Sequence, residues 1–412
     1  MTSTSGTKKP RVVVAGGGVA ALEACLALRH HLSAAGLDIV LLTPTERFDY
    51  RPLSVLEPFR GVARWSMSLR RFAADQGLEL VNDALAAVAQ RPRVAVTGAG
   101  HELRYDTLLI AAGGHTADAV DGALTFRGAR DGRAVRELLD AQPRSLAFAA
   151  PSGASWPLPV YELALLSAAE LRQRGAPTEV KLVTPEATPL SLFGAEASEF
   201  VCDLLSRHGV ELATSSTPVA ARAGMLELAD GRRLQAEHVV ALPRVLGRRL
   251  QGVPRDEEDF IPVDEHGRVK GLAHVHAAGD GADFPFKHGG LAAQQADAAA
   301  EAMLEDLGLP IVAHPFEPVI QGVLFTQAEL AYVEAALSGG APGTAERPAS
   351  LRWWPPAKIV GRHLSPYLVE RAGAPLTPEH LPGAKLVAVS VDARRLVRSV
   401  RGVLDGDPVP PG

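Results

Sequence analysis

Short apolar runs that alternate with a helical pattern predict buried parallel strands near the start of the chain. Residues 11–15 read RVVVA, residues 38–42 read DIVLL, and a helical pattern covers residues 22–32 between them. A continuous apolar run suits a strand of a parallel sheet, because helices cover both faces of such a sheet. The order predicts a strand–helix–strand unit.

The same order returns in the middle of the chain. Residues 145–150 read SLAFAA, a helical pattern covers residues 161–174, and residues 179–183 read EVKLV. A further helix is expected over residues 195–207. Strands that alternate with helices in this way are typical of α/β folds.

Two further segments end in small residues, which let a ligand approach the backbone. Residues 93–97 and 102–110 predict a hairpin, and its second arm runs into Ala111-Ala112-Gly113-Gly114. Residues 274–280, HVHAAGD, predict a strand that ends in a Gly-Asp pair. A helix is expected to follow over residues 291–307.

Composition narrows the function classes. The 412 residues correspond to two or three domains at about 150 residues each. A net charge of −5 without a basic stripe argues against nucleic acid as a partner. No apolar stretch is long enough to span a membrane, and glycines 16–18 interrupt the one segment that resembles a signal peptide. We expect a cytoplasmic protein.

Cysteine and histidine spacing argues against redox disulfides and metal sites. Cys25 and Cys202 lie far apart in predicted helices, and we interpret both as small core residues. They form no disulfide scaffold, which favours a reducing compartment. His274 and His276 share one face of a predicted strand, but no third ligand stands at a recognisable spacing. We therefore expect no metal site.

The turn after the first strand has the residue types of a dinucleotide site. Residues 16–21 read GGGVAA, a GxGxxA pattern between a strand and a helix. Gly16 allows the tight turn, Gly18 lets the backbone approach a diphosphate, and Ala21 is small enough for close helix packing. The N-terminal amides of the helix would face the phosphate charge. This turn predicts dinucleotide binding.

The first unit departs from that pattern at its second strand. The strand ends in Thr43-Pro44, where an acidic residue that binds ribose is expected. Glu46 is either a substitute for that residue or a solvated loop carboxylate.

The second unit departs further. Its turn over residues 151–159 carries prolines and Trp156, with Gly153 as the single glycine. The next strand ends in Thr184-Pro185, and Glu186 follows two positions after Thr184. In a dinucleotide site, backbone amides of this turn contact the diphosphate, and glycines let the backbone approach it. Prolines have no N–H to offer, so NAD(P)H is a doubtful cofactor.

Three separated segments together resemble one family. They read GGGVAALE, YDTLLIAAGG and HVHAAGDGADFPFKHGGLAAQQAD. They are similar to the two-dinucleotide-fold flavoproteins of the pyridine nucleotide-disulfide oxidoreductase superfamily. Within it, the chain most resembles the branch of sulfide:quinone oxidoreductases, flavocytochrome c sulfide dehydrogenase flavoproteins and type II NADH dehydrogenases. The likeness covers roughly residues 10–325.

The resemblance implies an α/β fold with two nested, three-layer Rossmann-like (FAD/NAD(P)-binding) domains and a small C-terminal α+β region. Residues 10–118 and 251–320 would form the FAD-binding domain, and residues 119–250 the second Rossmann-like domain. Residues 321–412 would form an interface region that shapes the acceptor site.

Two features of the C-terminal region have two interpretations each. Trp353 and Trp354 line an apolar acceptor pocket or serve packing alone. The predicted basic helix over residues 393–404 packs on its own domain or, less favoured, rests on a membrane surface.

The resemblance also implies an FAD site. Gly16 and Gly18 would face the diphosphate, Arg51 and Pro52 would lie beside the isoalloxazine, and Asp280 would bind the ribityl chain or phosphate. The expected FAD-binding residues are Gly16, Gly18, Val19, Ala20, Ala21, Thr43, Arg51, Pro52, Leu85, Ala112, Gly113, Gly279, Asp280, Lys287 and Gly290. The candidates for catalysis are Pro52, Tyr161, Glu162 and Lys287.

Glu162 and Lys287 each have two interpretations, one catalytic and one structural. Glu162, in the Tyr161-Glu162 pair, relays a proton to flavin N5, or it is a helix N-terminal glutamate favoured by the helix dipole. Lys287 adds positive charge at the flavin pyrimidine beside the dipole of the following helix, or it is a solvated loop lysine.

These features predict an FAD-dependent oxidoreductase that passes two electrons from an unidentified small-molecule donor to a small acceptor such as a quinone. It would work without redox-active cysteines. Two alternatives stay open: an NAD(P)H dehydrogenase with an atypical nicotinamide site, and a flavin-binding partner or sensor with little turnover. A homodimer is also left open.

Overall fold

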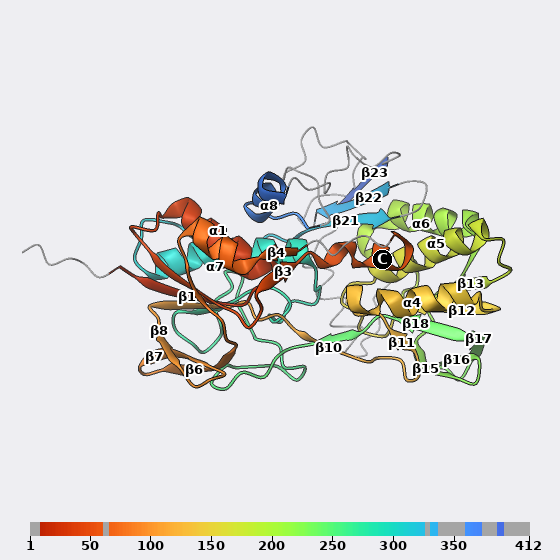
Figure 1. Ribbon diagram of the computed structural model, residues 1–412, viewed down its shortest axis with the longest axis horizontal. Coiled ribbons are helices and arrows are strands. Elements are labelled where there is room, and N and C mark those ends of the chain that lie inside the picture. The colour runs from red at the N-terminus through yellow and green to blue at the C-terminus, as the bar shows by residue number, and fades with distance from the viewer. Residues whose placement is uncertain (1–8, 61–65, 326–329, 337–358, 373–384, 391–412) are drawn as a thin grey trace, which may run out of the picture.

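The computed structural model describes residues 9–60, 66–325, 330–336, 359–372 and 385–390. These residues form two lobes side by side, with a smaller group of elements along one edge (Figure 1). Each lobe is built around a five-stranded parallel sheet.

The first lobe holds the sheet β20-β9-β1-β2-β5. Its central strand β1 (Arg11–Ala15) pairs with β2 (Asp38–Leu42) on one side and with β9 (Thr107–Ile110) on the other. The edge strands are β5 (Glu79–Val81) and β20 (Val275–Ala277). Because β20 joins β9 after more than 160 intervening residues, the second lobe is inserted between two parts of the first.

Helices cover one face of the first sheet, and a small antiparallel sheet covers the other. The helices α1 (Val19–His31) and α7 (Gly289–Asp306) pack side by side, and the second face meets β6 (Leu85–Gln90), β7 (Arg93–Thr97) and β8 (Glu102–Arg104). The inner residues of β1 are fully buried between these layers, as the apolar run RVVVA requires.

The second lobe repeats this architecture in the sheet β11-β18-β12-β13-β14. The strands are β11 (Leu124–Thr125), β12 (Ser145–Ala149), β13 (Glu179–Val183), β14 (Val210–Ala213) and β18 (His238–Ala241). One face packs against helices, and the other against a three-stranded sheet. The helices are α4 (Ala129–Ala141), α5 (Leu158–Gln173) and α6 (Ala195–Arg207), and the three strands are β15 (Pro218–Arg222), β16 (Met225–Leu228) and β17 (Arg233–Gln235).

Short elements connect and cover the lobes. The antiparallel pair of β10 (His115–Ala117) with β19 (Arg244–Leu246) runs between them. The other elements are β3 (Arg47–Asp49), the 3-10 helix η1 (Arg51–Leu56), α2 (Glu57–Arg60), β4 (Ser66–Ser68), α3 (Leu69–Gln76), the 3-10 helix η2 (Ser191–Phe193), β21 (Val319–Phe325), β22 (Leu330–Ala336), α8 (Leu364–Ala372) and β23 (Lys385–Ser390).

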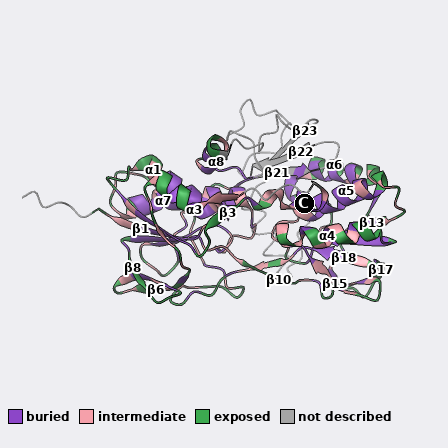
Figure 2. Cartoon of the chain, in the orientation of Figure 1, coloured by how far each residue is buried: buried purple, intermediate pink, exposed green. Residues whose placement is uncertain are grey.

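The predicted α/β fold class with two Rossmann-like units is confirmed. Figure 2 shows α5 and α7 with mostly buried residues, as expected for helices that lie between a sheet and another layer. The final helix expected over residues 393–404, together with Trp353 and Trp354, lies outside the described residues.

The bounds of several predicted elements differ, and two of these differences change the local structure. The strand expected over residues 102–110 is two strands, β8 and β9, because the chain leaves the antiparallel sheet and then enters the parallel one. The strand expected over residues 274–280 extends only over Val275–Ala277, since His274 and Gly279 have φ angles of 57° and 83°.

Candidate active site

Three consecutive glycines between β1 and α1 shape the turn that was expected to hold a dinucleotide. Gly16 has a φ of 147°, and a Cβ on it would lie 2.1 Å from the carbonyl oxygen of Ala111. A Cβ on Gly17 would lie 2.5 Å from Oγ1 of Thr43. A Cβ on Gly18, in contrast, would meet no atom within 4 Å. Gly16 and Gly17 therefore serve close packing, and the space beside Gly18 is open to a ligand.

The N-terminus of α1 faces that open space. Gly18 is its N-cap and supplies no side-chain hydrogen bond, while the N–H of Leu22 donates to the Gly18 carbonyl at 3.1 Å. The earlier amides of the helix have no partner within the helix. Ala20 and Ala21 are buried, so no bulky side chain separates the helix end from the turn. Such a helix end binds phosphate groups.

The segments after β9 and β20 form the far wall of the groove. Since these strands are parallel neighbours, Gly113 and Gly281 come together, and a Cβ on Gly281 would lie 3.3 Å from the Gly113 oxygen. Gly279 donates its N–H to Oε1 of Gln295 at 2.8 Å. Ala112 and Asp280, both half-buried, stand beside these glycines.

Of the residues expected to bind the cofactor, Thr43 follows β2 and Leu85 lies in the core on the second face of the sheet. Thr43, at the end of β2, is buried, and its Oγ1 lies 3.1 Å from Oγ1 of Thr45. Glu46 is exposed on the following loop. Leu85, in β6, packs with Ala15 in the core below the sheet.

A cavity of about 250 Å³ lies where the two lobes meet. It brings together Arg51, Pro52, Glu162, Asp280 and Lys287, which come from three separate parts of the chain. Its apolar lining is Val55, Phe126, Ala154, Trp156, Leu158, Pro159, Leu242, Pro243 and Val245. Charged groups combined with an apolar lining suit a planar molecule with polar edges.

Lys287 is a buried cation at this cavity. Its side chain is 9% exposed, Nζ donates to the carbonyl oxygen of Ala282 at 2.5 Å, and Nζ lies 3.6 Å from the centroid of the Phe260 ring. Burial lowers the pKa of Lys287 to about 8, although the Asp280 carboxylate opposes this. Burial raises the pKa of Asp280, and Lys287 and Arg51 oppose that rise.

Glu162 and Tyr161, adjacent on α5, point in different directions. Glu162 is fully buried and lines the cavity. The Tyr161 hydroxyl donates instead to Oε2 of Glu186 at 2.5 Å, and Oγ1 of Thr184 donates to the same oxygen at 3.0 Å. Consecutive helical residues diverge by about 100°, which explains the separation. Tyr161 therefore does not reach the cavity.

The turn between β12 and α5 is packed against the first lobe. The Trp156 ring lies 4.3 Å from the His288 ring, and the Lys287 N–H donates to the Ser155 carbonyl at 3.3 Å. The helix starts with Pro157 as its N-cap, which has no N–H and makes no side-chain cap bond. This turn offers few backbone donors to a second diphosphate.

The N-terminus of α7 meets the same cavity. Gly289 lines it, and His288, the N-cap, makes no side-chain cap bond to the helix. Gly290, the next residue, is buried. A Cβ on it would lie 3.0 Å from the His288 ring, so the position has little room for a side chain. The positive end of an 18-residue helix thus points toward the cavity beside Lys287.

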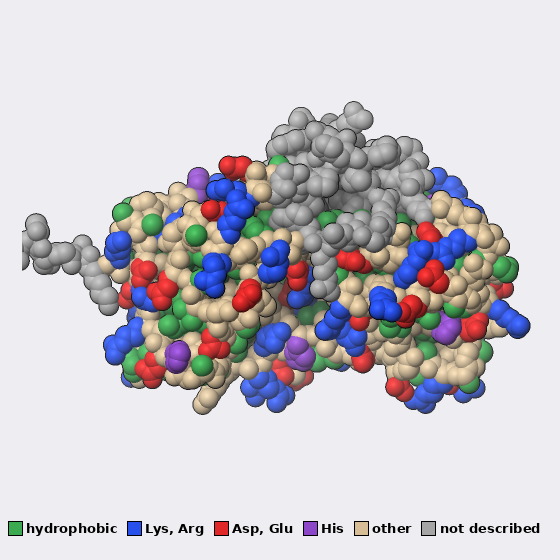
Figure 3. All heavy atoms as spheres, viewed as in Figure 1, with side chains coloured by type: hydrophobic (Ala, Val, Ile, Leu, Met, Phe, Trp, Pro, Cys, Tyr) green, Lys and Arg blue, Asp and Glu red, His purple; other side chains and the backbone are tan. Residues whose placement is uncertain are grey.

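A second, basic cavity of about 420 Å³ meets the first one at Arg51, Ser54, Arg127 and Gly128. Its lining adds Arg130, Arg248 and His115, with Asp49 and Glu57 as the acids. Lys and Arg side chains gather around β10 on the face shown in Figure 3.

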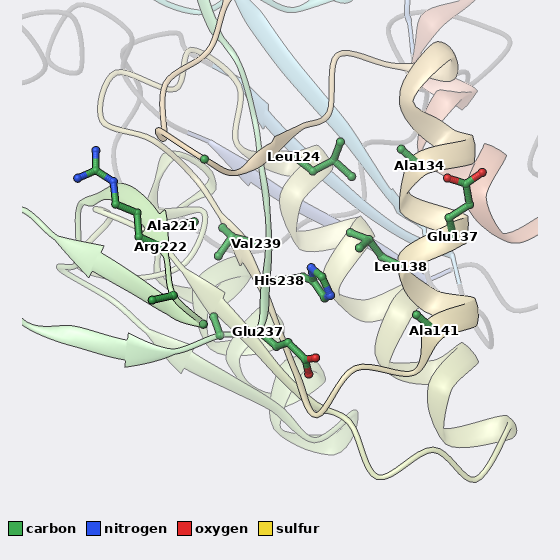
Figure 4. Close-up of a pocket in the computed structure, with 14 residues that line it drawn as sticks. Leu124, Ala134, Glu137, Leu138, Ala141, Ala221, Arg222, Glu237, His238 and Val239 are labelled. Carbon is green, nitrogen blue, oxygen red and sulfur yellow. The ribbon is translucent and has the colours of Figure 1, made fainter.

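A third cavity of about 500 Å³ lies between α4, β18 and the β15–β16 hairpin (Figure 4). Leu124, Leu138 and Val239 line it, with Glu137, Arg222 and His238 among its polar residues. None of the residues expected in the FAD site lines this cavity.

Comparison with known proteins decides the family. The profile of the pyridine nucleotide-disulphide oxidoreductases matches residues 10–302. The chain belongs to this family. Two relatives are 27% identical over 293 residues, which is 66% of this chain and 72% of theirs. They are the NADH dehydrogenase-like proteins MT1860 and Rv1812c from two strains of Mycobacterium tuberculosis.

Solved structures show the same fold for this pyridine nucleotide-disulphide oxidoreductase. The sulfide:quinone oxidoreductase of Aquifex aeolicus superposes with a TM-score of 0.73 at 20% identity, over 79% of this chain and 84% of that one. A ferredoxin reductase of Rhodopseudomonas palustris gives a TM-score of 0.64 at 19% identity, over 80% and 83%. At such identities the likeness concerns the fold.

The protein is thus an FAD-dependent oxidoreductase, and its residues fit the cofactor. The open space beside Gly18, at the uncapped end of α1, accommodates a diphosphate. Gly113 has a φ of 66° with open space beside it, which leaves room along the groove toward Asp280. Within the described residues, no helix is long and apolar enough to cross a membrane.

Cys25 is a core residue, as expected, whereas Cys202 is only partly buried and belongs to no core cluster of the described residues. Cys25 is fully buried in α1, and burial raises the pKa of its thiol to about 12. Cys202 lies half-buried on α6 in the other lobe. A thiol needs a lowered pKa and access to act as a nucleophile, and Cys25 has neither.

No sequence pattern indicates the cluster that Glu23, Asp297 and His363 form. Glu23 lies on α1, Asp297 on α7, and His363 immediately precedes α8. Their possible ligand atoms all lie within 4.8 Å of one another. Burial raises the pKa of both carboxyl groups. Even the two members nearest in sequence, Asp297 and His363, are 66 residues apart. The three residues meet only when α1, α7 and α8 pack together, so no spacing pattern could reveal the cluster.

Proposed function

We propose that this protein passes two electrons from an unidentified small-molecule donor, through FAD, to a planar quinone-like acceptor that reaches the flavin from the Trp156 side of the 250 Å³ cavity. NAD(P)H is not the donor in this proposal. The observation that carries it is the closed turn between β12 and α5, whose Trp156 packs on His288.

Two features of the second lobe support a donor other than NAD(P)H. The turn over residues 151–157 presents prolines where backbone amides would have to bind a diphosphate. Glu186, the acidic residue after β13, is engaged by the hydroxyls of Tyr161 and Thr184. A nicotinamide dinucleotide would have to displace these contacts before it could bind in the usual way.

The cavity supports a planar and largely apolar acceptor. Trp156 and Phe126 provide aromatic walls, and aromatic contacts contribute about 0.5–1.5 kcal/mol beyond buried area. Glu162 lies where its carboxyl group can exchange a proton with an acceptor oxygen. Lys287 and the N-terminus of α7 supply positive charge.

FAD supplies the two-electron chemistry when it is bound, and the chain positions the reactants and balances charge. Lys287 and the α7 dipole stabilise negative charge at their end of the cavity. The apolar wall excludes water from the same space, which strengthens those electrostatic contacts. Cys25 and Cys202 take no part in this proposal, because they lie in the helices of separate lobes.

Anaerobic stopped-flow spectroscopy tests the proposal in two halves. The oxidised holoenzyme is mixed with NADH, NADPH or sulfide, and the dithionite-reduced holoenzyme with a water-soluble ubiquinone analogue. We expect slow or no bleaching of the flavin by the nicotinamides and rapid reoxidation by the quinone. Rapid bleaching by NADH would overturn the donor half and favour NADH oxidation, which the names of the 27% identical relatives suggest.

A variant locates the acceptor. Trp156→Ala removes an aromatic wall, and we expect the KM for the quinone to rise about tenfold, corresponding to about 1.4 kcal/mol. Val219→Ala, an exposed position on β15, serves as the control and is expected to leave this KM unchanged. An unchanged KM in Trp156→Ala would refute the acceptor half of the proposal.

A further inference from the structure

Three elements of the first lobe meet at a cluster of potential metal ligands that the flavin chemistry does not use. Glu23 of α1 is fully buried, and the side chains of Asp297 and His363 are 19% and 16% exposed. Nε2 of His363 lies 3.9 Å from Oδ1 of Asp297, which is too far for a hydrogen bond. Two carboxyl groups and an imidazole therefore face one another over a small gap.

Backbone contacts fix the position of the Glu23 carboxylate. The backbone N–H groups of His363 and Leu364 donate to its two carboxylate oxygens, each at 2.7 Å. A Cβ on Gly361 would lie 2.4 Å from Oε2 of Glu23, so only glycine permits this approach. These bonds hold the carboxylate in one orientation and leave a lone pair on each oxygen for a further partner.

Asp297 brings an independent indication of a missing partner. Its Oδ1 is buried and has no hydrogen-bond partner among the described residues. An unpaired buried carboxylate oxygen is costly. The neighbouring Glu23 carboxyl group raises the pKa of Asp297, by repulsion and through a side-chain hydrogen bond between the two groups. Among the described residues, Arg362 is the cation that lowers the pKa of the Asp297 carboxyl, and it is itself exposed. A bound cation would satisfy the oxygen and neutralise the pair.

We propose that Glu23, Asp297 and His363 bind a divalent transition-metal ion of the Zn²⁺ type, which fastens the segment before α8 to α1 and α7. One imidazole nitrogen and two carboxylate oxygens are ligands that Zn²⁺ accepts at about 2.0–2.2 Å. Tetrahedral ligands at that distance lie roughly 3.4 Å apart, so the side chains need to close by about an ångström. Water completes the fourth position.

The ligand types favour Zn²⁺ over Mg²⁺. Imidazole nitrogen suits Zn²⁺, whereas Mg²⁺ prefers six oxygen ligands and keeps much of its water. The ion would have a structural role, because its ligands join elements that are 340 residues apart in sequence. The inference is independent of the electron donor and acceptor proposed above.

Calorimetric titration of the chelator-treated holoenzyme with ZnCl₂ tests the site, together with the metal content after dialysis. We expect one Zn²⁺ per chain, a higher unfolding temperature in saturating Zn²⁺, and no binding of Mg²⁺ at the same concentration. Asp297→Asn and His363→Asn should each weaken Zn²⁺ binding at least about tenfold, since each removes one ligand.

His314→Asn is the matched control. His314 is exposed and pairs at 2.9 Å with Glu301, whose side chain is 16% exposed, which makes a His–carboxylate pair of the same chemistry. It should leave the main binding event unchanged. Failure of the wild-type protein to bind Zn²⁺ would mean that a proton occupies the gap, and the proposal would be wrong. Equal Zn²⁺ affinity in wild type and both ligand variants, or stoichiometric Mg²⁺ binding, would also overturn it.

Discussion

Gly16 and Gly18 differ at the residue scale, although they belong to one motif. Gly16 is required by the fold, because a Cβ there would lie 2.1 Å from the Ala111 oxygen. Gly18 has open space beside it, so its missing side chain benefits the ligand alone. Glycine is thus needed for two separate reasons, for close packing at position 16 and for cofactor access at position 18.

Alanine substitutions separate these demands. We expect Gly18→Ala to fold with nearly unchanged stability and to bind FAD at least about tenfold more weakly, because a methyl group occupies space at the diphosphate. Gly16→Ala should lower both stability and FAD content, since the φ of 147° and the clash disturb the turn itself. Chemical denaturation and FAD titration of the apoproteins measure the two effects.

The control for this pair is Gly36→Ala. Gly36 is exposed in the loop before β2, where a Cβ would find its nearest atom at an ordinary 3.5 Å. It should change neither quantity. An FAD affinity of Gly18→Ala equal to that of wild type would show that the diphosphate does not lie at this helix end.

Lys287 gives the site a dependence on pH. Burial lowers its pKa to about 8, so it is charged below pH 8 and neutral above it in the oxidised enzyme. Negative charge on the reduced flavin would raise that pKa, and reduction above pH 8 would then take up one extra proton. We expect the midpoint potential of the flavin to fall more steeply above pH 8, by about 30 mV per pH unit for two electrons.

Spectroelectrochemical titration between pH 6 and pH 10 checks this. Lys287→Met should remove the change of slope and lower the potential at pH 7, because the positive charge is lost. Lys270→Met, at an exposed lysine, should keep the wild-type curve. A change of slope that persists in Lys287→Met would assign the titration to another group.

At the element scale, α5 shows how one helix serves a core and a cavity. Glu162 faces the cavity, while Tyr161 donates to Glu186 inside the second lobe. We expect Glu162→Gln to lower kcat with the quinone about 100-fold, a size typical of proton-transfer groups, without loss of stability. Tyr161→Phe should leave kcat near wild type and cost about 1–2 kcal/mol of unfolding free energy.

Steady-state kinetics and urea unfolding on both variants decide between the two roles. A kcat defect in Tyr161→Phe as large as that of Glu162→Gln would restore Tyr161 as a candidate for catalysis. An unaffected kcat in Glu162→Gln would remove the proton-transfer role of Glu162 and leave it as a helix N-terminal residue.

The elements themselves were largely predictable from sequence. β1, β2 and β13 have the expected bounds, because a strand buried on both faces needs a local apolar run that can be recognised without the partner strands. The direction of the Tyr161 side chain was not predictable, since it depends on where Glu186 lies after β13. The Glu23, Asp297 and His363 cluster depends on three packed elements and left no local pattern.

At the scale of the whole molecule, the groove for FAD is formed by segments that precede and follow the second lobe in sequence. The turn after β1 and the segment after β20 are joined through neighbouring strands of one sheet, with the entire second lobe between them in sequence. The cavity with Trp156 and Glu162 forms only when the second lobe packs against η1 and α7. A ligand that spans this junction therefore stabilises the arrangement of the lobes.

Removal of FAD should accordingly weaken the molecule as a whole. A ligand at 100 times its Kd adds about 2.7 kcal/mol to the unfolding free energy, which for a chain of 412 residues corresponds to roughly 3 °C in unfolding temperature. We expect the apoprotein to unfold at least that much earlier in a calorimetric scan, and readdition of FAD to restore the wild-type curve. Because Gly18→Ala weakens FAD binding and leaves the apoprotein intact, its unfolding temperature should depend on FAD concentration more gradually than that of wild type. Identical curves for apoprotein and holoprotein would mean that FAD binds the native chain no more tightly than the unfolded chain, which would contradict this prediction.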